Sequence, residues 1–184
     1  MKDLNREELL SQPTKQLGVK MGLDMYLEAR KYFSKIDFRK DGEEVLPDYQ
    51  KIANLFPADA DEFGEHTGAT IDLTIGYWRK ANQIHAWFVR ECAGGVDECQ
   101  RTPVRDGKLR ELKVIIEFLL DIKDLSTAGE EIEKLLPTQS GFFFGSTEID
   151  EYYWNDLRRT LDILNKAIEL EEEHGCSIAY QASW

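Results

Sequence analysis

The chain has 184 residues, of which 42% are hydrophobic and 32% charged, and its net charge is −12. A chain of this length matches one domain and can bury enough apolar surface to form its own core. The negative charge repels phosphate backbones and anionic membranes, which disfavours nucleic acid as a partner. No apolar run approaches the roughly 20 residues that cross a bilayer, so we expect no membrane partner.

The cysteine count and the N-terminal composition indicate the compartment and the domain limits. Three cysteines, an odd number, and the absence of a signal-peptide pattern favour reduced thiols in a cytoplasm. Residues 1–20 hold few large apolar side chains, whereas a fold-like pattern begins at Met21. We therefore expect a poorly ordered N-terminal extension over residues 1–20 and a single domain over residues 21–184.

Three segments alternate apolar and polar residues, which is the pattern of a half-buried strand. They are Leu23–Arg30, Ala69–Gly76 and Ser177–Trp184. One apolar and one polar face per strand is typical of antiparallel or mixed sheets. The sequence thus predicts a small three-stranded sheet whose strands pair across long stretches of chain.

Apolar stripes at helical spacing predict five helices between these strands. The predicted helices cover Pro47–Phe56, Tyr77–Cys92, Lys108–Ile122, Ala128–Leu136 and Glu148–His174. Thr147 is the expected N-cap of the last helix, and Gly175 its C-terminal stop. Amphipathic helices that cover one face of a small sheet give an α+β domain.

The second predicted helix carries an unusual polar stripe beside its apolar one. Trp78, Asn82 and His85 follow one another at helical spacing, and Arg79 stands next to them. An indole face, an amide and an imidazole together are suited to gripping a planar polar ligand. The alternative is an ordinary boundary helix whose Trp and His bridge the core and water.

A second candidate segment runs from Thr138 to Ser146, directly ahead of the longest helix. Glycines and hydroxyls at a helix N-terminus can present N–H groups to an anion, but the Gly-Lys-Ser/Thr ending of a phosphate loop is missing. Glu148 and Asp150 would also repel a phosphate there. The three phenylalanines at 142–144 cannot all face one side, so at least one is expected to contact a ligand or a partner. The alternative is that the loop packs its phenylalanines into the core of the domain.

We expect the helix edge and this loop to form one site in a non-enzymatic binding protein. The expected ligand is a planar polar small molecule of nucleotide-like type, with no cofactor. The predicted ligand-binding residues are Trp78, Arg79, Asn82, His85, Thr138, Gln139, Ser140, Phe143 and Ser146.

Metal and catalytic motifs give little support to other functions. His85, Cys92 and Cys99 recur at intervals of seven, which is not a zinc spacing, and we recognise no His-Glu-x-x-His motif or acidic calcium loop. No Gly-x-Ser-x-Gly elbow occurs, so we predict neither a metal site nor a catalytic residue. Two alternatives remain open. One is capture of a host protein through Phe142–Phe144, and the other is a small hydrolase or transferase that uses His85 with an acid from the polar sheet face.

Five motifs in a fixed order support a resemblance over residues 21–184. They are Met21–Tyr26, Tyr77–Phe88, Leu135–Ser146, Asp150–Tyr153 and Ser183–Trp184. Together they resemble a family of bacteriophage and prophage proteins to which no activity is assigned. Residues 1–20 and the acidic stretch Asp59–Glu65 fall outside the family pattern. The resemblance implies a bacterial cytoplasm and an accessory role for a virus in its host, and it supplies no catalytic residue.

Overall fold

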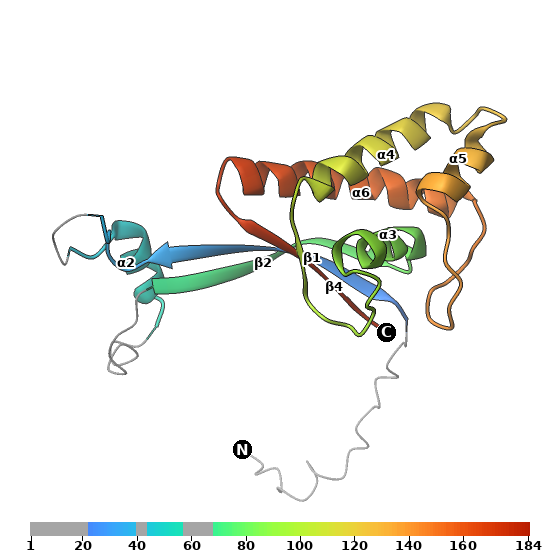
Figure 1. Cartoon of the computed structure of the whole chain (residues 1–184). Coiled ribbons are helices and arrows are strands. Elements are labelled where there is room, and N and C mark those ends of the chain that lie inside the picture. The colour runs from blue at the N-terminus through green and yellow to red at the C-terminus, as the bar shows by residue number, and fades with distance from the viewer. Residues whose placement is uncertain (1–21, 40–43, 57–67) are drawn as a thin grey trace, which may run out of the picture.

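The computed structural model describes residues 22–39, 44–56 and 68–184, and within them the chain forms an α+β fold (Figure 1). The elements in chain order are β1 (Asp24–Ser34), α2 (Pro47–Ala53), β2 (Gly68–Arg79), α3 (Asn82–Cys92), β3 (Thr102–Val104), α4 (Lys108–Ile122), α5 (Ala128–Leu135), α6 (Glu151–Glu172) and β4 (Ser177–Ser183). The predicted α+β class is confirmed. The predicted extension over residues 1–20 and the stretch Asp59–Glu65 lie outside the described residues.

The sheet is antiparallel and has four strands in the order β2-β1-β4-β3, one more than the sequence predicted. The additional strand, β3, has only three residues and includes Pro103. Three residues are too few to display an alternating pattern, and a proline is tolerated in a sheet at an edge strand. Local patterning therefore could not reveal β3.

The two longest strands, β1 and β2, form a hairpin that extends beyond the rest of the sheet. Their pairing runs from Asp24 opposite Arg79 to Ser34 opposite Gly68, whereas β4 pairs with β1 only as far as Arg30. The outer half of the hairpin therefore has no third strand beside it among the described residues. It carries the short helix α2 near its tip, away from the other helices (Figure 1).

The core lies between one face of the sheet and the helices α3, α4 and α6. The inward side chains of β1 are fully or nearly fully buried, as the alternating pattern predicted, and they include Met25 and Leu27. A β-carbon at Gly76 in β2 would lie 2.4 Å from Cγ2 of Ile163 in α6. Glycine at this position therefore allows the longest helix to approach the sheet closely.

Two helix starts differ from the predicted ones. The predicted start at Tyr77 is wrong because β2 continues through Arg79, with Trp78 buried and Tyr77 on the outer face. The predicted apolar face of β2 is also wrong at this end, because a register shift in the pairing with β1 turns Gly76 and Trp78 inward. α3 begins only at Asn82, after a turn in which Lys80 has a φ of 62°. The predicted N-cap Thr147 is also wrong, because Asp150 caps α6 by accepting hydrogen bonds from the backbone N–H groups of Tyr152 and Tyr153.

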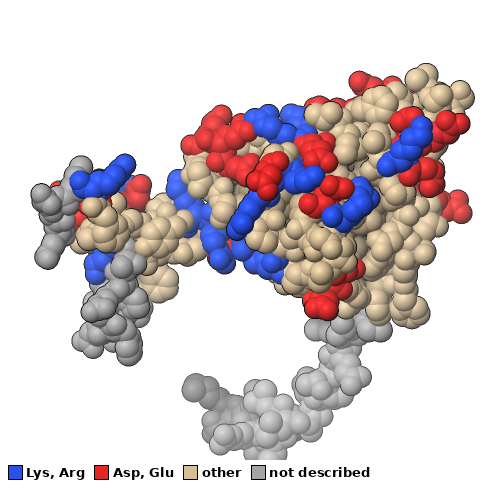
Figure 2. All heavy atoms as spheres, in the orientation of Figure 1, with Lys and Arg blue, Asp and Glu red and all other residues tan. Residues whose placement is uncertain are grey.

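The helices and the surface of the described chain show the same lack of long apolar runs and the same mixture of charges as the sequence. No helix in the described ranges is long and apolar enough to span a membrane. On the face shown in Figure 2, Lys and Arg side chains are interleaved with Asp and Glu rather than separated from them.

We predict that Asp150→Ala lowers the free energy of unfolding by about 1 kcal/mol, because two N–H groups at the start of α6 lose their side-chain acceptor. Urea unfolding measures this change. Asp162→Ala, at an exposed position in the middle of the same helix, is the matched control and should cost nothing, since alanine favours helix. Equal effects of the two substitutions would contradict the capping role.

Candidate functional site

The buried side chain of Asn82 connects the two segments that the sequence singled out. Its amide nitrogen Nδ2 donates to the backbone carbonyls of Phe144 at 3.1 Å and Ser146 at 2.8 Å. Its oxygen Oδ1 accepts from the backbone N–H of Gln139 at 2.8 Å. One side chain at the start of α3 thus holds the loop over residues 138–146 at both of its ends.

A hollow of about 250 Å³ lies beside this connection, between the β2–α3 turn, the loop and the start of α6. Its walls consist of Arg79, Lys80, Asn82, Gln83, Thr138, Gly145, Ser146, Glu148, Asp150, Tyr152, Tyr153 and Asp156. Four of the predicted ligand-binding residues are among them, namely Arg79, Asn82, Thr138 and Ser146. Folding therefore brings the two segments together at one hollow.

Two other predicted residues, Trp78 and His85, lie in the core instead of at this hollow. Trp78 is 1% exposed, and its indole N–H donates to the Thr160 hydroxyl at 2.8 Å. His85 is 0% exposed. Substituting either residue would therefore test stability rather than ligand contact.

The remaining predicted residues lie on the loop outside the hollow. Gln139 and Ser140 are exposed, and Phe143 is half-buried with its ring edge-on to Phe142 at 4.8 Å between centroids. Phe142 is 91% exposed, whereas Phe144 is buried against His85 and Trp184. One phenylalanine thus closes the core while another projects from the surface.

Sequence reasoning missed Gln83 and Asp156, which contribute polar groups to the hollow. Gln83 is 2% exposed, and its Nε2 donates to Oδ2 of Asp156 at 3.5 Å. Burial raises the pKa of the Asp156 carboxyl to about 6, against the weaker opposing effects of the Gln83 hydrogen bond and the Arg159 charge. In the sequence, Asp156 is one more acid in a charged helix, so no local signal marks it.

The other walls give the hollow a mixed charge and an aromatic rim. Arg79 and Lys80 stand on the side of the β2–α3 turn, and Glu148 and Asp150 on the side of α6. Tyr152 is 80% exposed. Among the described residues that line the hollow there is no His or Cys, so the arrangement suits hydrogen bonding and stacking better than nucleophilic chemistry.

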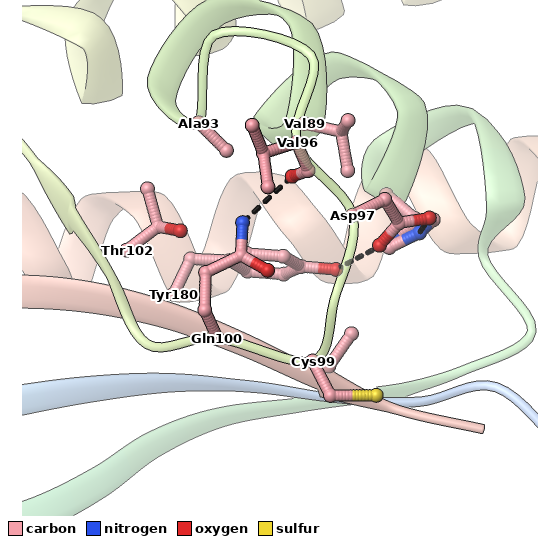
Figure 3. Close-up of a pocket in the computed structure, with 10 residues that line it drawn as sticks. Val89, Ala93, Val96, Asp97, Cys99, Gln100, Thr102 and Tyr180 are labelled. Atoms are coloured by element: carbon pink, nitrogen blue, oxygen red, sulfur yellow. Dashed lines mark hydrogen bonds and ion pairs between the residues drawn. The ribbon is translucent and has the colours of Figure 1, made fainter.

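His85 takes part in a separate buried cluster. Its Nδ1 is 2.7 Å from the Tyr180 hydroxyl, and its Nε2 is 3.1 Å from Oδ2 of Asp97. Tyr180 and Asp97 approach this point from β4 and from the loop after α3 (Figure 3). The adjoining space is about 10 Å³, which is enough for one water molecule but not for a substrate. The carboxylate that a His85 hydrolase needs is present, but the cleft is not.

Comparison with known proteins yields a weak likeness to binding proteins. No family model matches the chain, and no solved structure matches it significantly. A sarcoplasmic calcium-binding protein of Hediste diversicolor is 26% identical over 133 residues, covering 70% of this chain and 72% of that protein. A sarcoplasmic calcium-binding protein of Perinereis vancaurica tetradentata is 26% identical over 126 residues, covering 66% and 68%.

One sequence segment has a calcium-type spacing that the search for acidic loops overlooked. The common twelve-residue calcium loop has oxygen ligands at positions 1, 3 and 5, glycine at position 6 and a glutamate, rather than an aspartate, at position 12. The segment Asp37–Asp48 has Asp37, Asp41, Gly42 and Asp48 at positions 1, 5, 6 and 12. Position 3 is Arg39, which departs from the pattern, and residues 40–43 lie outside the described residues.

We predict that Asp156→Asn makes the protein about 1–2 kcal/mol more stable at pH 7.5, after discounting for partial exposure of the carboxyl. The pKa of the Asp156 carboxyl is about 6 in the folded protein, raised from 3.8. Between these two pH values the folded protein binds a proton that the unfolded chain does not bind, so the stability falls as the pH rises from 3.8 to about 6. The advantage of the variant should therefore shrink toward pH 4. Urea unfolding at pH 4, 6 and 7.5 measures it, with Asp162→Asn as control. A difference that is the same at all three pH values would refute the assignment.

Proposed function

We propose that this protein is a non-enzymatic binding protein that holds a planar polar small molecule in the hollow beside Asn82. The observation that carries the proposal is the convergence of the β2–α3 turn, the 138–146 loop and the start of α6 on that one hollow. Its walls offer amide, hydroxyl and carboxyl groups together with a tyrosine at the rim. A concave site in which such groups converge is the usual place for a small ligand to bind.

The size and charge of the hollow narrow the expected ligand. About 250 Å³ is below the roughly 300–1,000 Å³ of sites for drug-sized molecules, so a base or a nucleoside fits better than a nucleotide. Glu148 and Asp150 place negative charge at the start of α6, where they repel a phosphate. The resemblance to phage proteins would place this binding function in a bacterial cytoplasm as an accessory activity.

We predict that a nucleobase or nucleoside at a hundredfold excess over its Kd raises the melting temperature by about 5–10 °C, the equivalent of about 2.7 kcal/mol for a chain of this size. A thermal-shift series with the four common nucleobases and their nucleosides measures this. Tyr152→Ala at the rim should reduce the shift, because the ligand loses a stacking surface. Phe142→Ala, at another largely exposed aromatic residue outside the hollow, is the matched control. Absence of any shift, or an undiminished shift in Tyr152→Ala, would remove the proposal.

A second candidate function is calcium binding at the segment Asp37–Asp48. It is supported by the 26% identity to two sarcoplasmic calcium-binding proteins and by the partial match to the calcium-loop spacing. An antiparallel bridge joins Ile36, the residue before the segment, to Val45 at its ninth position, and α2 starts within its last two residues. Arg39 opposes this function, because its guanidinium occupies Oδ1 of Asp37 at 3.1 Å.

We predict that Arg39→Asp strengthens Ca²⁺ binding at least tenfold over the natural chain. The substitution removes the positive charge that holds Asp37 and supplies an oxygen at the third loop position. Isothermal titration of the full chain with CaCl₂ measures the affinity, and Mg²⁺ serves as the competing ion. Arg39→Ala separates removal of the charge from addition of a ligand. If neither the natural chain nor Arg39→Asp binds Ca²⁺ at millimolar concentration, the segment is not a calcium site.

A further inference from the structure

We propose that Asp156, oriented by Gln83, selects ligands that carry two adjacent N–H donors on one edge of a planar ring, such as a 2-amino-6-oxopurine. The inference rests on the proposed function and names the ligand class for the same hollow. It concerns the part of the hollow that sequence analysis did not find.

The acceptor capacity of Asp156 is mostly unused within the described part of the chain. A carboxylate offers two oxygens with about four acceptor positions. Among the described residues, one side chain donates a hydrogen bond to this carboxylate: Gln83 through Nε2 at 3.5 Å, which is the long limit for such a bond. The carboxyl is half-buried on the wall of the hollow, and its oxygens are not sealed from solvent. An N–H donor of a ligand can therefore take the place of water at this carboxylate.

Two parallel N–H···O bonds to one carboxylate are both stronger and more specific than a single bond. A ring edge with an N–H beside an amino group matches the spacing of the two oxygens. The same ring carries an oxo group, which the positive charge of Lys80 on the turn side of the hollow can meet, whereas Arg79 there is paired with Asp24 at 3.7 Å. A neutral ring with donors on one edge and an acceptor on another therefore matches the mixed charge of the walls.

Gln83 is a positioning residue in this arrangement. It is almost fully buried near the start of α3, so its amide has little freedom to move away from Asp156. Asp156 lies in the second turn of α6, whose start is fixed by the Asp150 cap. The positions of the Asp156 carboxyl on α6 and of the Gln83 amide on α3 are thus set before a ligand enters.

The ionised form of Asp156 is required for two simultaneous N–H bonds. The charged and titratable groups around it are Arg159 and Asp150 on α6, Glu148 ahead of α6, and Arg79 and Lys80 on the β2–α3 turn. Burial is the largest influence on the carboxyl and favours its protonated form below about pH 6. Affinity for a donor-pair ligand should therefore fall when the pH drops from 7.5 to 5.

The test is isothermal titration of the full chain at pH 7.5 with guanosine, inosine and adenosine. Inosine lacks the amino donor, and adenosine lacks the ring N–H. We expect guanosine to bind about ten- to a hundredfold more tightly than either, since a hydrogen bond to a charged group contributes about 1.5–3 kcal/mol. Asp156→Asn should abolish the preference while the melting temperature shows that it is folded, and Asp162→Asn should retain the preference.

The outcomes separate the two proposals. If none of the three nucleosides nor their free bases binds, both the hollow as a ligand site and the selection by Asp156 are refuted. If nucleosides bind but guanosine has no advantage, or Asp156→Asn keeps that advantage, only the role of Asp156 is refuted. A preference for guanosine that disappears in Asp156→Asn and weakens at pH 5 supports both.

Discussion

The arrangement around the hollow depends on the three hydrogen bonds of the Asn82 side chain. The 138–146 loop forms no helix or strand, so its backbone groups have no ladder in which to pair. The buried amide of Asn82 instead pairs with two of its carbonyls and one of its N–H groups. Because an unpaired buried polar group costs more than a formed bond contributes, loss of this amide would destabilise the loop by more than three ordinary hydrogen bonds.

Further contacts make this junction the meeting point of four segments. The backbone N–H of Leu23 donates to the carbonyl of Phe143, and the N–H of Lys80 donates to the carbonyl of Leu23. The Tyr153 hydroxyl donates to the carbonyl of Leu136 at 3.0 Å, which ties the start of α6 to the end of α5. The backbone around the hollow is therefore held in place by several segments before a ligand enters. Such preorganisation lowers the entropy that binding costs.

The elements that are determined by neighbouring residues could be predicted from the sequence. One-sided burial imposes a period of two on the first half of β1, and α4 was predicted with its observed bounds. In β2 the predicted apolar face is not the buried one, since Leu73 is 56% exposed whereas Gly76 and Trp78 are buried. Trp78 and His85 share a helical stripe in the sequence, but a strand ends and a helix begins between them, so the stripe does not exist in space. Asp156 was missed because its contact with Gln83, more than seventy positions away in the sequence, exists only in the folded chain.

The two candidate functions lie at opposite ends of one sheet, and the sheet explains why they are separable. The hollow adjoins the end of β2 at Arg79, where four segments meet and the packing is dense. The segment Asp37–Asp48 follows the far end of β1, beyond the point where β4 stops pairing, and α2 lies there apart from the body (Figure 1). Few core contacts reach that end of the hairpin, so an ion bound there would stabilise the tip alone. Ligand binding at the hollow would instead act on the body, because its walls are continuous with the core.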